Sequence, residues 1–158
     1  MSDAAARLPH IDEHSVVVDA AREPTWESLL RVVDASVSSG AAPRFARIVG
    51  CVDTDPSGPR PLARGSVLSG FHVEAATAPA ELVLAGHHRF SAYALVFRLD
   101  ELGDGRTRVS AETRAEFPDL KGVIYKALVI GTRMHVLVTR RILAGVKRRA
   151  ERSRAGKS

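Results

Sequence analysis

Hydrophobic and polar residues alternate through two long segments, 91–101 and 106–117, which flank a short polar linker. The linker, Leu102-Gly-Asp-Gly105, is typical of a β-hairpin turn. When Leu102 is placed opposite Arg106, the apolar positions of both segments fall on the same face. The predicted pairs are Leu99 with Val109, Phe97 with Ala111, Leu95 with Thr113, and Tyr93 with Ala115. Because a shift by one residue would turn every apolar side chain outward, the pattern predicts this register.

Shorter apolar segments predict four further strands, over residues 14–19, 44–52, 65–76 and 80–87. Between the first two, apolar residues change to helical spacing from Arg22 to Val33, with Pro24 suited to the first turn, so a short helix is expected there. Residues 53–61 are rich in Pro, Gly and Asp and predict a loop.

The C-terminal part of the chain predicts one long helix, from Asp119 to about Arg152. Apolar residues recur there at helical spacing, and no proline follows Pro118. At 1.5 Å per residue such a helix would span roughly 50 Å. The centre of its apolar face carries small residues, namely Ala127, Gly131, Val138 and Gly145. An interior glycine costs about 1 kcal/mol relative to alanine. We expect either close approach to a sheet or the floor of a cavity for an apolar ligand.

Composition predicts a single globular domain. The 158 residues are 45% hydrophobic, which is ordinary for a globular protein. We expect a loose lead-in over residues 1–13, one domain over 14–152 and a basic tail over 153–158. Charged residues interrupt the most apolar region, so no membrane span is expected, and the N-terminus does not resemble a secretory signal. A single cysteine, Cys51, allows no intrachain disulfide, and a cytoplasmic location is the default expectation.

Positive charge is concentrated at the C-terminal end. Residues 140–158 hold eight basic residues and one acidic residue, a net charge of +7, whereas residues 1–139 carry a net charge of −2. One interpretation is a solvated helix end whose cations complement the helix dipole. The other is contact between residues 140–158 and an anionic partner, either nucleic-acid phosphate or a membrane surface. No aromatic residue lies among these cations, which argues against base stacking.

The order of elements resembles a known fold. The segments that carry the resemblance are 14–26, the hairpin around 97–110 and the helix after Pro118. Together they resemble the helix-grip fold of the START-like, or SRPBCC, superfamily, which includes polyketide cyclases, Bet v 1-like ligand binders and lipid-transfer START domains. The resemblance implies an α+β fold with a curved antiparallel sheet wrapped on a long C-terminal helix. It also implies a cavity between sheet and helix that usually takes a hydrophobic small molecule.

Familiar catalytic motifs are absent from the sequence. There is no cysteine pair for zinc, no phosphate-binding loop and no dinucleotide motif, and the chain has neither Asn nor Gln, so no metal or cofactor is expected. The candidate ligand-binding residues are Phe71, Tyr93, Phe97, Thr113, Phe117, Gly131, Met134 and His135. Among them, His135 is a candidate acid or base and Tyr93 a candidate hydroxyl donor, although both also suit structural roles. His87, His88 and Arg89 form either a polar rim or a solvated turn.

Three functions remain open from the sequence. The first is binding or transport of a hydrophobic small molecule or lipid in the cavity. The second is a cyclase, dehydratase or hydrolase that uses His135 or Tyr93, which would need a carboxylate or second polar group within about 3 Å. The third is an interaction module that docks on an anionic surface through its basic C-terminus. Ligand identity, catalysis and oligomeric state are not determined by the sequence.

Overall fold

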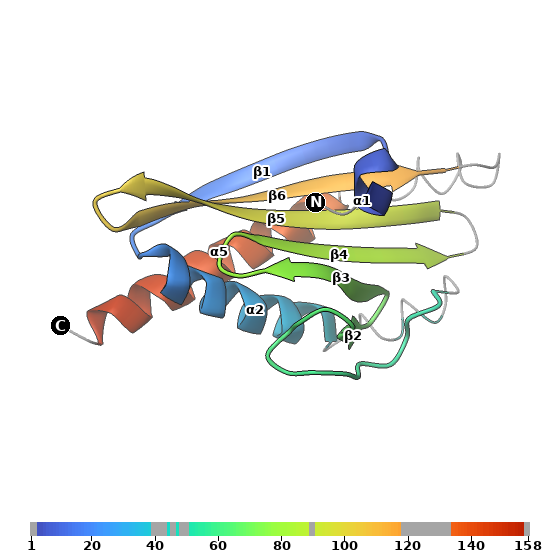
Figure 1. The fold of residues 1–158 in the computed structure, drawn as a ribbon, viewed down its shortest axis with the longest axis horizontal. Coiled ribbons are helices and arrows are strands. Elements are labelled where there is room, and N and C mark those ends of the chain that lie inside the picture. Colours follow the sequence, from blue (N-terminus) through green and yellow to red (C-terminus); the bar gives the residue numbers. More distant parts are fainter. Residues whose placement is uncertain are drawn as a thin grey trace.

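The protein folds as an antiparallel sheet with helices on both of its faces (Figure 1). The computed structural model describes residues 3–38, 44, 47, 51–88, 91–117 and 134–156. The elements are α1 (Asp3–Arg7), β1 (His10–Val18), α2 (Arg22–Ser38), β2 (Val67–Leu68), β3 (Phe71–Thr77), β4 (Glu81–His88), β5 (Ser91–Gly103), β6 (Arg106–Glu116) and α5 (Met134–Ala155). The six strands are ordered β1-β6-β5-β4-β3-β2. None of the described helices is both long enough and apolar enough to cross a membrane.

The β5–β6 hairpin has the predicted register. All four predicted pairs are present: Leu99 with Val109, Phe97 with Ala111, Leu95 with Thr113, and Tyr93 with Ala115. At the turn, however, a bulge places Gly103, and not Leu102, opposite Arg106. The bulge fits a turn in which Gly103, Asp104 and Gly105 all have positive φ angles, of 84°, 53° and 67°.

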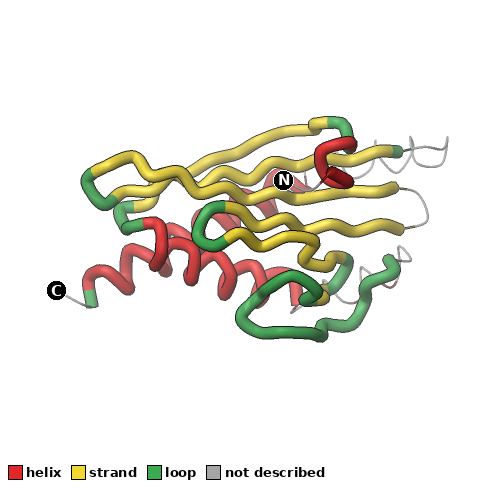
Figure 2. Tube along the Cα trace, in the orientation of Figure 1, coloured by secondary structure: helices red, strands yellow, loops and turns green. Residues whose placement is uncertain are grey.

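The strand predicted over 65–76 is divided in two. Gly70 has φ of 85° and ends β2, and the chain reverses into β3 at Phe71. The prediction was therefore wrong here, because an apolar alternation does not reveal a turn that one glycine makes. The loop before β2 runs beside the end of α2 (Figure 2), where Arg60 Nε donates to Asp34 Oδ2 at 2.9 Å.

The N-terminal prediction also needs correction. Residues 1–13 were expected to be a loose lead-in, yet they include α1 and the start of β1 at His10. Ala5 of α1 is only 1% exposed and packs with Val83 and Val96 on one face of the sheet. The strand predicted over 44–52 lies mostly outside the described residues. Of its described positions, 44 and 47 are helical, and Cys51 forms an isolated β-bridge with His88.

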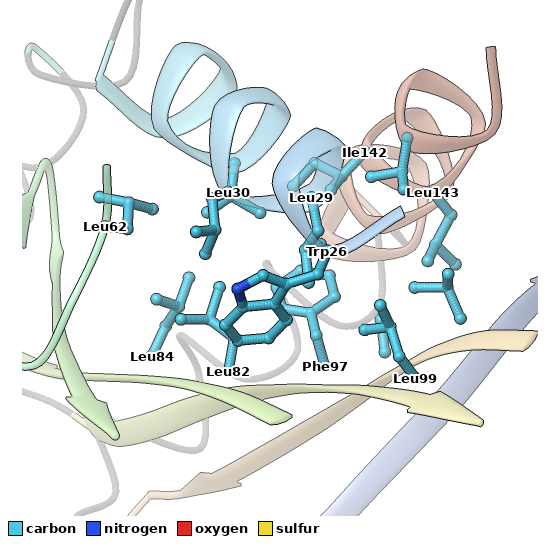
Figure 3. Close-up of a cluster of buried hydrophobic side chains, with 14 of the residues drawn as sticks. Trp26, Leu29, Leu30, Leu62, Leu82, Leu84, Phe97, Leu99, Ile142 and Leu143 are labelled. Atoms are coloured by element: carbon cyan, nitrogen blue, oxygen red, sulfur yellow. The ribbon is translucent and has the colours of Figure 1, made fainter. Parts of the chain in front are cut away.

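The main core lies between the opposite face of the sheet, hereafter the inner face, and helices α2 and α5 (Figure 3). Trp26 and Leu29 of α2 and Ile142 of α5 pack against Leu82 and Phe97 of the sheet. Phe97, a predicted cavity residue, is 0% exposed within this closed cluster. This part of the interface is therefore solid core.

Helix α5 follows the edge strand β1. Lys147 Nζ donates to the Val17 carbonyl at 2.7 Å, and Arg154 Nη1 donates to the Asp19 carbonyl at 2.9 Å. In return, the Asp19 amide donates to Glu151 Oε1 at 3.0 Å. These contacts cover part of an exposed sheet edge and fix the helix along the strand. Three of the charged side chains in the C-terminal half of α5 are thus structural.

Gly145, one of the small residues of α5, packs against a different element from the one predicted. A Cβ atom at Gly145 would lie 3.0 Å from Val32 Cγ1, so this glycine permits close approach to α2 and not to the sheet. Val138 was predicted on the apolar face but is 46% exposed. Ala127 and Gly131, like the whole predicted helical stretch 119–133, lie outside the described residues.

Candidate functional site

Polar side chains meet on the inner face where α5 begins. Asp12 of β1 pairs with Thr113 of β6, and His14 pairs with Ala111, so Asp12, His14 and Thr113 all face the helices. His135, in the first turn of α5, lies above Asp12, and its Nε2 is 2.9 Å from Asp12 Oδ2. We call Asp12, His14, Thr113 and His135 the inner polar cluster.

A single carboxylate oxygen organises this cluster. Asp12 Oδ2 is hydrogen-bonded to His135 and lies 3.4 Å from His14 Nε2. The three side chains are only partly exposed, at 23% for Asp12, 20% for His14 and 17% for His135. The carboxylate required within about 3 Å of His135 by the enzyme hypothesis is therefore present.

The pKa of Asp12 shows how the cluster is charged. Burial raises this pKa, but the neighbouring Thr113 hydroxyl, the hydrogen bond with His135 and the positive potential of His135 and His14 together bring it below its usual value. Asp12 is therefore an anion at neutral pH and accepts a hydrogen bond. His135 Nε2 therefore donates the proton of this hydrogen bond, and the other ring nitrogen, Nδ1, is left without a partner.

Four buried polar atoms of the cluster have no hydrogen-bond partner of good geometry. They are Asp12 Oδ1, His14 Nε2, Thr113 Oγ1 and His135 Nδ1. The Thr113 hydroxyl is near enough to Asp12 to influence its pKa, yet the geometry of a full hydrogen bond is not reached. Buried polar atoms are nearly always paired, by protein, water or ligand. Four unpaired atoms in one place indicate capacity for an additional polar group.

Tyr93 lies in the next row of the inner face, nearer the sheet end. Its hydroxyl donates to the Gly70 carbonyl at 2.7 Å and lies 3.4 Å from Cys51 Sγ. The Phe71 ring meets Tyr93 edge-on, with ring centroids 5.1 Å apart. Opposite Tyr93 is Gly86, where a Cβ atom would lie only 2.6 Å from the tyrosine ring. Because Gly86 has no side chain, the Gly70 carbonyl and the Tyr93 ring can both pack against its backbone.

His88 and Ser91 form a second buried polar pair beyond Tyr93. His88 Nε2 and Ser91 Oγ are 3.1 Å apart, and the two residues are 8% and 5% exposed. Burial, together with the charge of His87, lowers the pKa of His88, so its imidazole is neutral at pH 7. His87 and His88 are the last two residues of β4, so the interpretation of residues 87–89 as a solvated turn is wrong for both. His87 is exposed, His88 is buried, and Arg89 lies outside the described residues.

The structure brings several predicted site residues together but not all of them. Phe71, Tyr93, Thr113 and His135 lie on or above neighbouring rows of the inner face, and Phe117 is half-buried just after β6. Phe97 belongs to the solid core. Gly131 lies outside the described residues, as does the side chain of Met134, the first residue of α5. Whether these residues line one cavity stays a prediction.

Asp12 is the residue that sequence reasoning missed. It was assigned to the lead-in, although Asp12 and His14 have the alternate spacing of one strand face. His10 lies on the opposite face, beside Glu112, because the register shifts between His10 and Asp12. That spacing was the available signal. The spacing alone did not show which residues Asp12 would contact, because only pairing with β6 places Asp12 next to Thr113.

Comparisons with known proteins support the fold. The sequence matches no family model and no curated protein. Among solved structures, the aromatase/cyclase Zhui from Streptomyces sp. R1128 aligns with a TM-score of 0.57 at 16% identity, over 92% of this chain and 95% of that chain. A protein from Chromobacterium violaceum aligns with a TM-score of 0.53 at 11% identity, over 90% and 99%. A protein from Thermobifida fusca aligns with a TM-score of 0.51 at 18% identity, over 87% and 91%.

At these identities the similarity concerns the fold alone. The observed architecture is α+β, with an antiparallel sheet packed against a C-terminal helix. This chain therefore has the helix-grip fold that the resemblance of its sequence implied.

Proposed function

We propose that this protein binds a hydrophobic small molecule that carries a polar group, with the polar group held at the inner polar cluster. The observation that carries the proposal is the set of four buried, unpaired polar atoms on Asp12, His14, Thr113 and His135. Leaving a buried polar atom unpaired costs about 1–3 kcal/mol. A hydroxyl or carbonyl of a ligand would recover much of that cost.

The surroundings of the cluster favour an apolar body for the ligand. Leu95 lies beside Thr113 on the inner face, and Ala115 and Tyr93 form the following row toward Phe71. Binding sites for small molecules typically combine such apolar walls with few polar groups. The similarity to an aromatase/cyclase structure supports the same class of ligand, through the fold only.

Proton transfer is the second candidate function, and the Asp12–His135 hydrogen bond of 2.9 Å favours it specifically. His135 Nδ1 would accept a proton from a bound molecule, and the Asp12 carboxylate would stabilise the imidazolium that forms. Such a pair suits removal of a proton next to a carbonyl, as a cyclase or dehydratase requires. Tyr93, whose hydroxyl is already bound to Gly70, fits this role less well.

Native mass spectrometry of the purified protein tests the binding function. A retained small molecule, identified after denaturing extraction, would support it, as would saturable binding of the neutral apolar dye Nile red. Thr113→Val should weaken either signal severalfold, because it removes one polar atom at constant volume. Thr107→Val is the matched control, since Thr107 lies on the same strand and its hydroxyl binds the Ala20 carbonyl at 2.8 Å, away from the cluster. Absence of both a retained compound and dye binding would refute the proposal.

Proton transfer has a separate test. The retained compound is incubated with the protein in D₂O, and deuterium uptake at carbon is followed by mass spectrometry. Asp12→Asn and His135→Asn should each abolish protein-dependent exchange, measured at a compound concentration that saturates the variant. Exchange that persists in both variants would exclude the pair as the proton acceptor and leave the binding function standing.

A further inference from the structure

An open groove separates the edge strand β1 from helix α5 on the outside of the fold. Its volume is about 460 Å³, which is within the range of small-molecule sites. The groove is lined by His14, Ser15 and Val16 of β1 and by Arg140, Leu143, Ala144, Lys147 and Arg148 of α5. The groove shares His14 with the inner polar cluster, and its other seven lining residues lie outside that cluster.

Cations stand at both ends of the groove, and apolar residues lie between them. Val16, Leu143 and Ala144 form the middle, where Leu143 is 3% exposed. Arg140 lies at one end and Arg148 two helical turns later, so their backbones are about 12 Å apart along the helix. A helix face that is only solvated does not need apolar residues between its cations, so this arrangement favours a binding site.

The two arginines are available to an external anion. Both are exposed, and within the part of the chain that the structure describes no carboxylate forms an ion pair with either one. Lys147 differs, because its ammonium already binds Glu151 Oε1 at 2.9 Å and the Val17 carbonyl. His14 also lines the groove, and its Nε2 lies 3.4 Å from Asp12 Oδ2 without forming a hydrogen bond of good geometry.

We propose that this groove binds an elongated dianion, a molecule with an anionic group at each end of an apolar chain, such as an α,ω-dicarboxylate. One anionic group pairs with Arg140 and the other with Arg148, and the chain lies on Val16, Leu143 and Ala144. Guanidinium groups suit carboxylate and phosphate equally, so the end groups are defined by charge. The proposal depends on Arg140 and Arg148, which do not belong to the inner polar cluster, and the groove touches that cluster only at His14.

The probe is sebacate, which has a carboxylate at each end of a ten-carbon chain. Decanoate, with one carboxylate, and decane-1,10-diol, with none, are compared with it at equal chain length. Two-dimensional ¹H–¹⁵N NMR titration of the full chain gives both affinity and location. Sebacate should shift the amide signals of Ser15, Val16 and Ala144. It should bind about two- to fivefold more tightly than decanoate, because one exposed ion pair contributes about that factor to affinity. The diol should bind least, and added salt should weaken sebacate binding.

Variants decide whether the groove is responsible. Arg140→Gln and Arg148→Gln should each reduce sebacate affinity about two- to fivefold and remove its advantage over decanoate. Arg141→Gln is the matched control, because Arg141 is an exposed arginine of the same helix outside the groove. Nile red binding at the inner face should stay unchanged in all three.

Three results would overturn the proposal. The first is equal binding of sebacate and decanoate. The second is an equal loss of affinity in Arg141→Gln, which would indicate unspecific attraction to the basic helix and would favour a membrane or phosphate surface as partner. The third is that sebacate shifts the signals of Tyr93 and Thr113 instead, which would assign the binding to the inner face.

Discussion

Glu112 makes the best-defined electrostatic contribution to the stability of this fold. It lies on the sheet face that α1 covers and is 6% exposed. Arg114 Nε donates to its Oε1 at 2.6 Å, Arg98 Nη1 donates to its Oε2 at 2.8 Å, and His10 Nδ1 is 3.1 Å from Oε1. Burial raises the pKa of Glu112, but these three partners outweigh burial and lower it from 4.5 to about 2.

The size of this effect follows from linkage. A fall in pKa from 4.5 to about 2 corresponds to roughly 3 kcal/mol of unfolding free energy at neutral pH. Because the pKa is lower in the folded state, this stability is fully present above about pH 4.5 and is lost as the pH falls toward 2. Glu112→Gln keeps the shape but has no charge at any pH, so it should destabilise the protein by about 3 kcal/mol at pH 7.

Urea unfolding of both proteins between pH 2 and pH 7 measures this difference. The stability gap between wild type and Glu112→Gln should be largest at pH 7 and should nearly close at the acid end. Glu116→Gln is the control, because Glu116 is an exposed carboxylate at the end of the same strand. A gap that is below 1 kcal/mol at pH 7, or that does not change with pH, would refute the reasoning.

Three further predictions concern the core and the site. Phe97→Ala removes a fully buried ring and should lower the unfolding free energy by about 3–5 kcal/mol in urea denaturation; a loss near zero would mean that its pocket is not close-packed. Gly86→Ala places a Cβ atom against the Gly70 carbonyl and the Tyr93 ring and should cost about 1–3 kcal/mol, measured by thermal melting. An unchanged melting temperature would contradict the close approach of these two groups to Gly86. Asp12→Ala should shift the tautomer of His135 away from its Nε2-protonated form, as measured by imidazole ¹⁵N chemical shifts, and an unchanged tautomer would show that Asp12 does not fix it.

The hairpin shows what can be predicted about this fold from the chain itself. Its register depends on two adjacent segments and the turn between them, so alternation of apolar residues was enough to predict four pairs correctly. The division of residues 65–76 at Gly70 was missed because one glycine with positive φ leaves no trace in the apolar pattern.

The candidate site could be predicted only in part. His135 was singled out because a titratable side chain borders the apolar face of a helix. Its partner Asp12 is 123 residues away, and no local pattern relates the two. The groove beside β1 was also invisible, since the sequence placed Arg140 and Arg148 in a basic helix end without a facing strand.

The sequence by itself determined the hairpin register, the helical character of α2 and α5 and the concentration of positive charge, because each depends on neighbouring residues and on short-range periodicity. Tertiary structure alone decided which side chains meet. Pairing of β1 with β6 brought Asp12 beside Thr113, and the course of α5 along β1 brought His135 above them and set Arg140 and Arg148 at the two ends of one groove. Such meetings depend on the packing of whole elements, and the same local pattern is compatible with many ways of packing them.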